Sequence, residues 1–316
     1  GYGARPVSAP PSRRAMTSHH PLTQADVSRI QLRFNSHFTR YTLADHAAEQ
    51  PQLAWRNDHY EYVVGGKWKG RDEIGELIEL GGPSRSLARV FATGGARSPE
   101  PSWQDRRASL VQTLLDAYDR AGASLVVLSD REAERSLSWY ADVGWIAIEE
   151  IVYYHKPDVD VPPPEGTLTV LPMSGRDLDR LMTLEQETFP WLWWYGLEEW
   201  ASITFSSATE TFLAYLDGSL VGYETHTVRN NRGHLDRLGV HPAWQGRRIG
   251  ADLLSLAIKR MERMGAQSVG LSTQWNNDRS RRLYERYGFT RVAGSQTLYG
   301  LCLLYTSPSP RDRQKS

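Results

Sequence analysis

The stretch HPAWQGRRIG, residues 241–250, combines residue types that bind anions. An apolar run precedes it and an apolar pattern with helical spacing follows it, so the sequence predicts a loop joining a strand to a helix. The first turn of a helix presents unpaired N–H groups and a positive dipole end. Gly246 and Gly250 allow close approach to the backbone, and Arg247 and Arg248 add positive charge. The stretch therefore predicts a phosphate-binding loop. An ordinary strand-to-helix turn with solvated arginines is the alternative.

Strand and helix patterns on both sides position this loop. Asp217-Gly218 lies between two apolar runs and predicts a hairpin, and Gly265 is expected to end a helix in the left-handed conformation. The other expected strands cover residues 167–172, 234–240, 267–273 and 290–301, and the expected helices cover 175–189, 246–264 and 277–287. This order predicts the fold class α/β (α+β mixed sheet).

An earlier stretch, EPSWQDRRAS, repeats the pattern of the loop. Trp103 aligns with Trp244. The similarity continues with residues 121–130 against 264–273 and residues 139–145 against 283–289. Matching order and spacing over such a length indicates duplicated domains. In the first repeat Asp105 and Ser109 replace the two glycines, so a carboxylate stands where an anion would need the backbone. We therefore expect tandem domains, the first of them degenerate.

The second repeat resembles the GNAT superfamily of acyl-CoA-dependent N-acyltransferases over roughly residues 167–301. In that family a Gln/Arg-x-x-Gly-x-Gly/Ala loop binds the pyrophosphate of coenzyme A. Residues 245–250 occupy this motif, with Arg248 in place of its first glycine. A second motif, Asn-x-x-Ala/Ser-x-x-Leu-Tyr before Gly-Phe, falls on Asn277, Ser280, Leu283, Tyr284, Gly288 and Phe289. Tandem acetyltransferases such as mycothiol synthase share the duplicated arrangement, in which the first repeat is expected to complete a shared sheet or to wall the acceptor cleft.

The resemblance implies acetyl-CoA as cosubstrate and assigns residues to it. The implied binding residues are Leu238, Gly239, Val240, Gln245, Gly246, Arg247, Arg248, Ile249, Gly250, Asn277 and Tyr284. The strand backbone at Leu238, Gly239 and Val240 would pair with the pantetheine, and an N–H group of this strand would stabilise the oxyanion.

Transfer of an acyl group to an amine requires an acid for the departing thiolate and a base for the amine. Tyr284 is the candidate acid, because a phenol with a pKa of about 10 is protonated at neutral pH. The alternative is that Tyr284 packs in the core as one more aromatic residue on an apolar helix face.

Glu224 is the first candidate for the base, and it shares one face of its strand with His226. Asp236 is a second carboxylate near the expected acceptor, and His226 or His234 could act through water. For each of these residues, a role as a solvated or hydrogen-bonded surface group is the alternative.

The aromatic segment FPWLWWYGLEEW, residues 189–200, lies where the family covers its acceptor site. Trp191, Trp194 and Tyr195 are the candidate substrate-binding residues, since aromatic faces attract a cationic or amphipathic guest. Packing in the core or between domains is the alternative.

The amino-acid composition narrows the classes of molecule that the chain is expected to bind. Lys and Arg total 37, as do Asp and Glu, so no overall field favours nucleic acid or an anionic membrane. No apolar run approaches the length of a membrane span, and no secretory signal is recognisable, so we expect a soluble cytoplasmic protein. Cys302 is the single cysteine, which leaves no disulfide framework and no cysteine-based metal site. No metal is expected.

The expected boundaries follow from these patterns. Residues 1–15 read as a non-native or disordered leader, 16–156 as the degenerate first domain, 157–166 as a proline-rich linker and 167–301 as the catalytic domain. Residues 302–316 begin with CLLYTSPSPRD, which resembles a translated sequencing adapter and is expected to be read-through.

Three function classes follow from the sequence. The first is an N-acetyltransferase that acetylates the primary amine of a small molecule by direct attack. The second is a protein or peptide N-acetyltransferase, and the third is a non-catalytic acyl-CoA-binding regulator. The sequence leaves the acceptor, the acyl length and the oligomeric state open.

Overall fold

The computed structural model describes residues 19–21, 53–57, 63–69, 71–81, 103–130, 144–204 and 206–303. The chain divides into two compact units, residues 1–67 with 76–123 and residues 68–75 with 124–316. The elements before residue 124 are β1 (His19–Pro21), β2 (Leu53–Asn57), β3 (Val63–Lys69), β4 (Arg71–Gly81) and α3 (Trp103–Arg120). β2 pairs antiparallel with both β1 and β3. All the residues expected to bind coenzyme A lie in the second unit.

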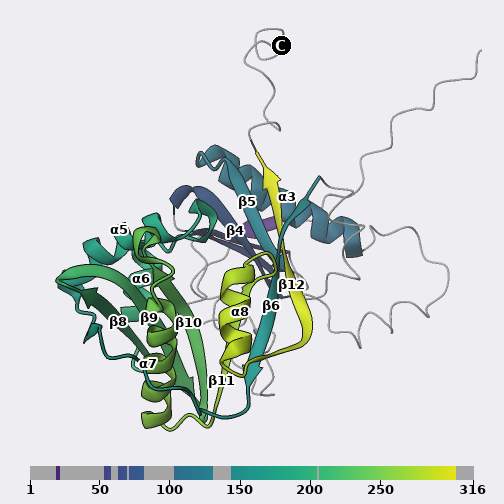
Figure 1. Cartoon of the computed structure of the whole chain (residues 1–316). Helices are drawn as coiled ribbons and strands as arrows, with labels where there is room; N and C mark the ends of the chain where they lie inside the picture. Colours follow the sequence, from purple (N-terminus) through teal and green to yellow (C-terminus); the bar gives the residue numbers. More distant parts are fainter. Residues whose placement is uncertain are drawn as a thin grey trace, which may run out of the picture. The chain divides into compact units, whose positions relative to one another are not determined.

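The second unit contains the strands and helices that the sequence predicts from residue 167 onward (Figure 1). Its strands are β5 (Leu125–Asp130), β6 (Ile146–Lys156), β7 (Thr169–Pro172), β8 (Thr209–Leu216), β9 (Ser219–Arg229), β10 (Arg232–Val240), β11 (Ser268–Gln274) and β12 (Thr290–Cys302). Its helices are α5 (Leu178–Thr188), α6 (Leu197–Thr204), α7 (Ile249–Arg263) and α8 (Asp278–Arg286). Helix α6 was not among the helices expected from the sequence. None of the helices in the described part of the chain is long and apolar enough to cross a membrane.

The strands of this unit follow the order β5-β12-β6-β11-β10-β9-β8-β7. β10 and β11 are parallel, while the other neighbouring strands in this order are antiparallel, so the sheet is mixed as predicted. The Asp217-Gly218 hairpin is present, with positive φ values of 48° and 77° at its two turn residues. This conformation matches the twist of the flanking strands.

The last strands of the two repeats are exchanged within this sheet. β6, from the first repeat, lies between β11 and β12, and β12, from the second repeat, lies between β5 and β6. Gln274, the last residue of β11, pairs with Ile151, and Asp130, the last residue of β5, pairs with Thr297. The two repeats therefore share one sheet. The division into compact units falls before β5, between residues 123 and 124.

Helices cover both faces of the sheet. A Cβ on Gly222 of β9 would meet Leu253 of α7, whereas the next residue, Tyr223, packs with Leu181 of α5 and Trp200 of α6. Because successive strand residues point to opposite faces, α7 covers one face and α5 and α6 cover the other. A further core cluster lies where α7 and α8 meet β6, β10 and β11.

Helix α7 begins at Ile249, three residues after the predicted start at Gly246. Gly246 has a φ of +83° and Arg248 a φ of +64°, values that a right-handed helix excludes. The segment from Gln245 to Arg248 is therefore a loop. Gly265 follows the helix with a φ of +95°, so the predicted left-handed cap is confirmed.

Candidate active site

A cavity of about 730 Å³ opens beside β10, α7 and α8. This volume is typical of small-molecule sites, which span roughly 300–1,000 Å³. The predicted coenzyme residues that line it are Leu238, Val240, Gln245, Gly246, Arg248, Ile249, Gly250 and Asn277. The structure therefore brings most of the predicted set together around one space. Gly239, Arg247 and Tyr284 do not line it.

The loop before α7 leaves its backbone open. A Cβ on Gly246 would meet no atom within 4 Å, so the positive φ of Gly246, rather than crowding, favours glycine there. A Cβ on Gly250 would lie 3.6 to 3.8 Å from Val240, Leu238 and Leu283, all of which line the cavity. These are ordinary contact distances. Glycine at 250 thus leaves part of the cavity empty, beside the first turn of α7 where an anion is favoured.

The strand next to this loop presents alternate residues to the cavity. Leu238 and Val240 of β10 line it, while Gly239 faces the other side of the sheet. A Cβ on Gly239 would lie only 2.6 Å from the ring of Tyr223. Glycine at 239 is therefore required by packing against Tyr223, which differs from the coenzyme contact implied by the family resemblance.

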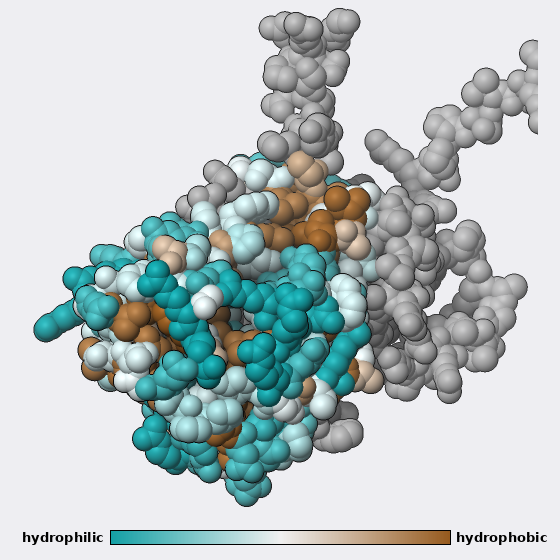
Figure 2. Space-filling model, viewed as in Figure 1, coloured by the Kyte–Doolittle hydropathy of each residue, from teal (hydrophilic) through white to brown (hydrophobic). Residues whose placement is uncertain are grey.

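Three arginines of α8 also line the cavity, and sequence reasoning did not include them. Arg279, Arg282 and Arg286 are exposed, and Arg279 donates a hydrogen bond to the side-chain oxygen of Gln245. Figure 2 shows a largely hydrophilic surface over α8. Spacings of three and four residues place these three arginines on one side of α8, and this spacing can be read from the sequence. They supply positive charge at the cavity, screened by salt because they are exposed.

The other polar residues of the loop region have partners within the protein. Arg247 stacks on Trp244, with its guanidinium carbon 4.7 Å from the ring centre. Arg248 forms a 2.6 Å ion pair with Glu165, and both side chains are at least half exposed. The Asn277 side-chain oxygen accepts a 3.2 Å hydrogen bond from the N–H of Ser280 and so caps α8.

The corresponding segment of the first repeat has a different local structure. α3 begins at Trp103, so Asp105 lies inside a helix. In the second repeat, Trp244 instead ends a short 3-10 turn and the helix starts only at Ile249. Without a glycine to adopt positive φ, the first repeat continues as helix where the second repeat forms its loop.

Tyr284 is buried in the core, 6% exposed. Its ring packs against Phe289 and Tyr154, with ring centres 5.9 and 6.3 Å away. Burial raises the pKa of Tyr284 to about 12, which keeps its hydroxyl protonated. Leu283 and Tyr287, on either side of it in the sequence, line the cavity instead. The acid role of Tyr284 stays a prediction.

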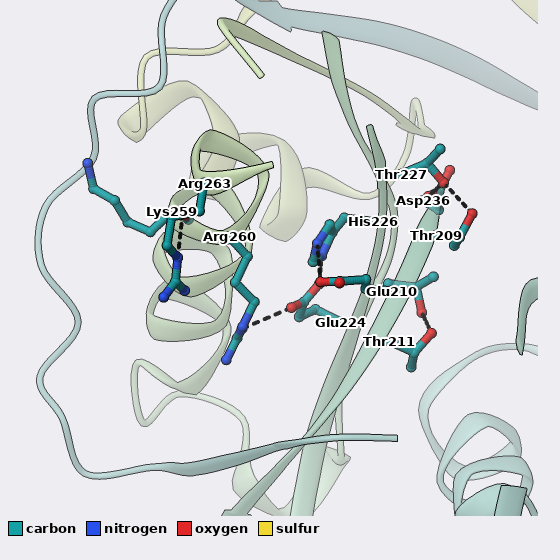
Figure 3. Close-up of polar contacts among 11 residues, drawn as sticks. Thr209, Glu210, Thr211, Glu224, His226, Thr227, Asp236, Lys259, Arg260 and Arg263 are labelled. Atoms are coloured by element: carbon teal, nitrogen blue, oxygen red, sulfur yellow. Dashed lines mark hydrogen bonds and ion pairs between the residues drawn. The ribbon is translucent and has the colours of Figure 1, made fainter. Parts of the chain in front are cut away.

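Glu224 does not line the cavity either. Figure 3 shows its carboxylate between His226 and Arg260. It shares a face of β9 with His226, as expected, and this face is covered by α7. One carboxylate oxygen lies 2.7 Å from Nδ1 of His226, and the other accepts a 3.0 Å hydrogen bond from Arg260 of α7. The carboxylate is fully buried, so its two charged or polar neighbours compensate its desolvation. This geometry supports a role in joining α7 to the sheet.

The alternative bases are also engaged away from the cavity. Asp236 accepts a 2.7 Å hydrogen bond from the Thr227 hydroxyl and lies 2.9 Å from Nδ1 of His234. Nε2 of His226 has no hydrogen-bond partner among the described residues, and the nearby Glu210 carboxylate is 3.6 Å away. None of these side chains lines the cavity.

The aromatic segment contributes residues other than the three predicted. Trp191 is 49% exposed, the Trp194 indole donates to the Phe189 carbonyl, and Tyr195 packs on Trp200. The lining residues from this region are Thr188, Phe189, Pro190 and Trp193. Residues 191–193 form a 3-10 turn, whose side-chain directions could not be read from the spacing of the tryptophans.

A buried polar network supports this aromatic wall. Arg237 of β10 donates hydrogen bonds to Glu185 of α5 and to the Trp193 carbonyl. Its guanidinium carbon lies 4.1 Å from the ring centre of Phe189 and 4.0 Å from that of Tyr195. Burial alone would lower the pKa of Arg237, but its interactions with Tyr223, Tyr195 and Glu185 raise that pKa above its ordinary value. Arg237 therefore stays charged and holds Phe189 and Trp193 in position.

Residues 178–289 match the acetyltransferase (GNAT) family. This match covers less than half of the chain and marks a region of the second repeat that is similar to GNAT acetyltransferases.

Two proteins of similar sequence are acetyltransferases, and one solved structure of similar fold is a GNAT protein. The chain is 28% identical over 138 residues to N-alpha-acetyltransferase 30 of Dictyostelium discoideum, covering 40% of this chain and 70% of that protein. It is 27% identical over 150 residues to mycothiol acetyltransferase of Streptomyces avermitilis, covering 47% of this chain and 39% of that protein. A tandem GNAT protein from the clavulanic acid biosynthesis pathway has a similar fold. That match has a TM-score of 0.55 at 12% identity and covers 82% of this chain and 86% of the other.

Proposed function

We propose that this chain transfers the acetyl group of acetyl-CoA to the primary amine of a small molecule by direct attack. The observation that carries the proposal is a single cavity with two chemically different walls. One wall has the open loop at Gly246 and the arginines of α8, and the other has Phe189, Trp193 and a carboxylate, Glu149. The first wall suits the phosphates of a coenzyme, and the second suits a cationic amine.

The residues present fit acetyl-CoA as cosubstrate. The glycine loop and the arginines Arg279, Arg282 and Arg286 would hold its phosphates, and the backbone of Leu238 and Val240 would lie along its pantetheine. When bound, acetyl-CoA supplies an acetyl group activated as a thioester. An N–H group of β10 would stabilise negative charge on the acetyl oxygen during attack, and Phe189 and Trp193 would exclude water.

The acid role predicted from the sequence is tested separately from the proposed transfer. Tyr284 is retained as the predicted proton donor for the thiolate, and the Tyr284→Phe variant tests it. If the hydroxyl acts in the chemical step, turnover falls by roughly 10²–10⁴-fold while acetyl-CoA still binds. Unchanged turnover, measured where chemistry limits the rate, would remove the tyrosine from the mechanism.

A peptide N-terminus is the second candidate acceptor. The similarity to N-alpha-acetyltransferase 30 over most of that protein's length favours it. The aromatic wall over the cavity favours a small acceptor instead, because an extended peptide needs an open groove along the sheet or loops.

One experiment separates the three function classes. The full chain is first titrated with acetyl-CoA by calorimetry and then assayed for release of free thiol with an amine panel. The panel contains tyramine, glucosamine, spermidine and a short peptide with a free N-terminus. Turnover with small amines supports the proposal, and turnover with the peptide alone supports the second candidate. Tight binding without turnover of any amine indicates a regulator, and absence of binding refutes all three.

A further inference from the structure

We propose that Glu149, on a strand of the first repeat, binds the ammonium group of the acceptor and takes its proton. This inference rests on the proposed acetyl transfer, because an amine that is protonated at neutral pH must lose a proton before it can attack. Glu149 lies on β6, the strand exchanged into the sheet between β11 and β12. The site would therefore combine Glu149 of the first repeat with the coenzyme-binding residues of the second repeat.

Glu149 is the only carboxylate side chain among the described residues that line the cavity. The charged groups that share the lining are Arg248, Arg279, Arg282 and Arg286, all cations. These arginines come from the loop before α7 and from α8, whereas Glu149 comes from β6. The single negative charge of the lining is thus placed on a different element from the positive charges that suit the coenzyme phosphates.

The position of Glu149 is fixed by its neighbours. Its Oε2 accepts a 3.0 Å hydrogen bond from the indole nitrogen of Trp193. Trp193 also packs against the core cluster of Val127 and Leu298, and Leu298 of β12 is the residue paired with Glu149 in the ladder between β12 and β6. The carboxylate and the indole therefore belong to one packed group, and both border the cavity. An aromatic face beside a carboxylate is a favourable environment for an ammonium ion.

Glu149 has the capacity to accept further hydrogen bonds. Among the described residues no cation forms an ion pair with it, whereas the adjacent Glu150 lies 3.7 Å from Arg291. An ionised carboxylate has about four acceptor positions, and the Trp193 indole uses one. Glu224, by contrast, is fully buried and already engaged by His226 and Arg260. The acceptor amine can therefore reach Glu149 from the cavity but cannot reach Glu224 without displacing the helix that covers it.

The proton and electron balance of the step is simple. The carboxylate of Glu149 takes one proton from the ammonium group, leaving a neutral amine with a free electron pair. That pair forms the new bond to the acetyl carbon, the carbon–sulfur bond breaks, and the sulfur leaves with its electrons as a thiolate. The second proton lost from the nitrogen balances the one that the thiolate takes up, so no oxidant or reductant is needed.

Three substitutions in the full chain test this role. Glu149→Gln keeps the shape and a hydrogen-bond acceptor for Trp193 but removes the charge. Glu149→Asp keeps the charge on a shorter side chain. Glu150→Gln, one residue along the same strand, removes a carboxylate that does not line the cavity. Tyramine is titrated into each protein by calorimetry, with and without coenzyme A, and acetyl-CoA affinity and initial rates with tyramine are measured in parallel.

We expect Glu149→Gln to weaken tyramine binding at least about 10-fold and to lower turnover by roughly 10²–10⁴-fold. Glu149→Asp should recover part of both, Glu150→Gln should match the wild type, and all four proteins should bind acetyl-CoA equally. A Glu149→Gln protein with wild-type tyramine binding and turnover would overturn the inference while leaving the proposed function intact. A wild-type protein that binds acetyl-CoA but not tyramine would also overturn it. Absence of acetyl-CoA binding by the wild-type chain would refute the proposed function. In that case, titration of tyramine without coenzyme would still test whether Glu149 binds the ammonium group.

Discussion

Glu185 of α5 and Arg237 of β10 form an ion pair that is almost entirely buried, with side-chain exposures of 0% and 8%. The Tyr223 hydroxyl also donates to Glu185, and burial raises the pKa of Tyr223 well above its ordinary value, so it remains a neutral donor. Breaking a buried pair from one side leaves an uncompensated charge, which costs about 3–5 kcal/mol.

Glu185→Gln should therefore lower the free energy of unfolding by about 3–5 kcal/mol, measured by urea denaturation. Glu187→Gln on the same helix is the matched control. Glu187 is about half exposed, and its 3.2 Å pair with His241 should contribute no more than about 1 kcal/mol. Equal stability of the two variants would contradict a structural role for the buried pair.

Gly246→Asp should abolish or greatly weaken acetyl-CoA binding, and Gly246→Asn should weaken it much less. Both side chains tolerate the positive φ of this position, so the comparison isolates the charge. A carboxylate about 4 Å from a phosphate is unfavourable by about 1 kcal/mol in water and about 4 kcal/mol near a protein surface. Calorimetry with acetyl-CoA measures the difference. Identical affinities would move the phosphate site away from this loop.

Tyr284→Phe should change how stability depends on alkaline pH. Because the pKa of Tyr284 is raised to about 12, the unfolded chain loses this proton first as the pH rises past its ordinary value of 10. The contribution of Tyr284 to stability is therefore complete below pH 10 and is lost as the pH rises through 12, by at most about 3 kcal/mol. Between pH 8 and pH 11, the midpoint of urea unfolding should fall less in the Tyr284→Phe variant than in the wild type. An identical fall in both proteins would argue against a buried phenol.

A truncated chain that begins at Pro162 should be poorly soluble or inactive. It would lack β5 and β6, so β12 would lose both of its neighbours and β11 would lose one. Unpaired strand edges promote aggregation. Soluble fraction, gel filtration and acetyl transfer, compared with the full chain, measure the effect. A soluble, monomeric and fully active truncated chain would make the first repeat an independent module.

Much of the second repeat could be predicted from local sequence. The Asp217-Gly218 hairpin, the glycine after α7 and the order of strands and helices depend on neighbouring residues, whose periodicity and backbone preferences are visible in the sequence. The loop at Gly246 was predicted for the same reason, since two glycines and two arginines lie within one short segment. These features need only a few consecutive residues to be specified.

Tertiary structure decided which side chains meet. The sequence placed Glu224 on the correct face of its strand, but only the packing of α7 on that face buried it beside Arg260. Trp193 rather than Trp191 or Trp194 lines the cavity because a 3-10 turn orients the segment. The sequence indicated two repeats, but strand exchange brings Glu149 of the first into contact with Trp193 of the second. Pairing between distant strands sets that contact, and no local pattern of residues encodes it, because register depends on the whole sheet.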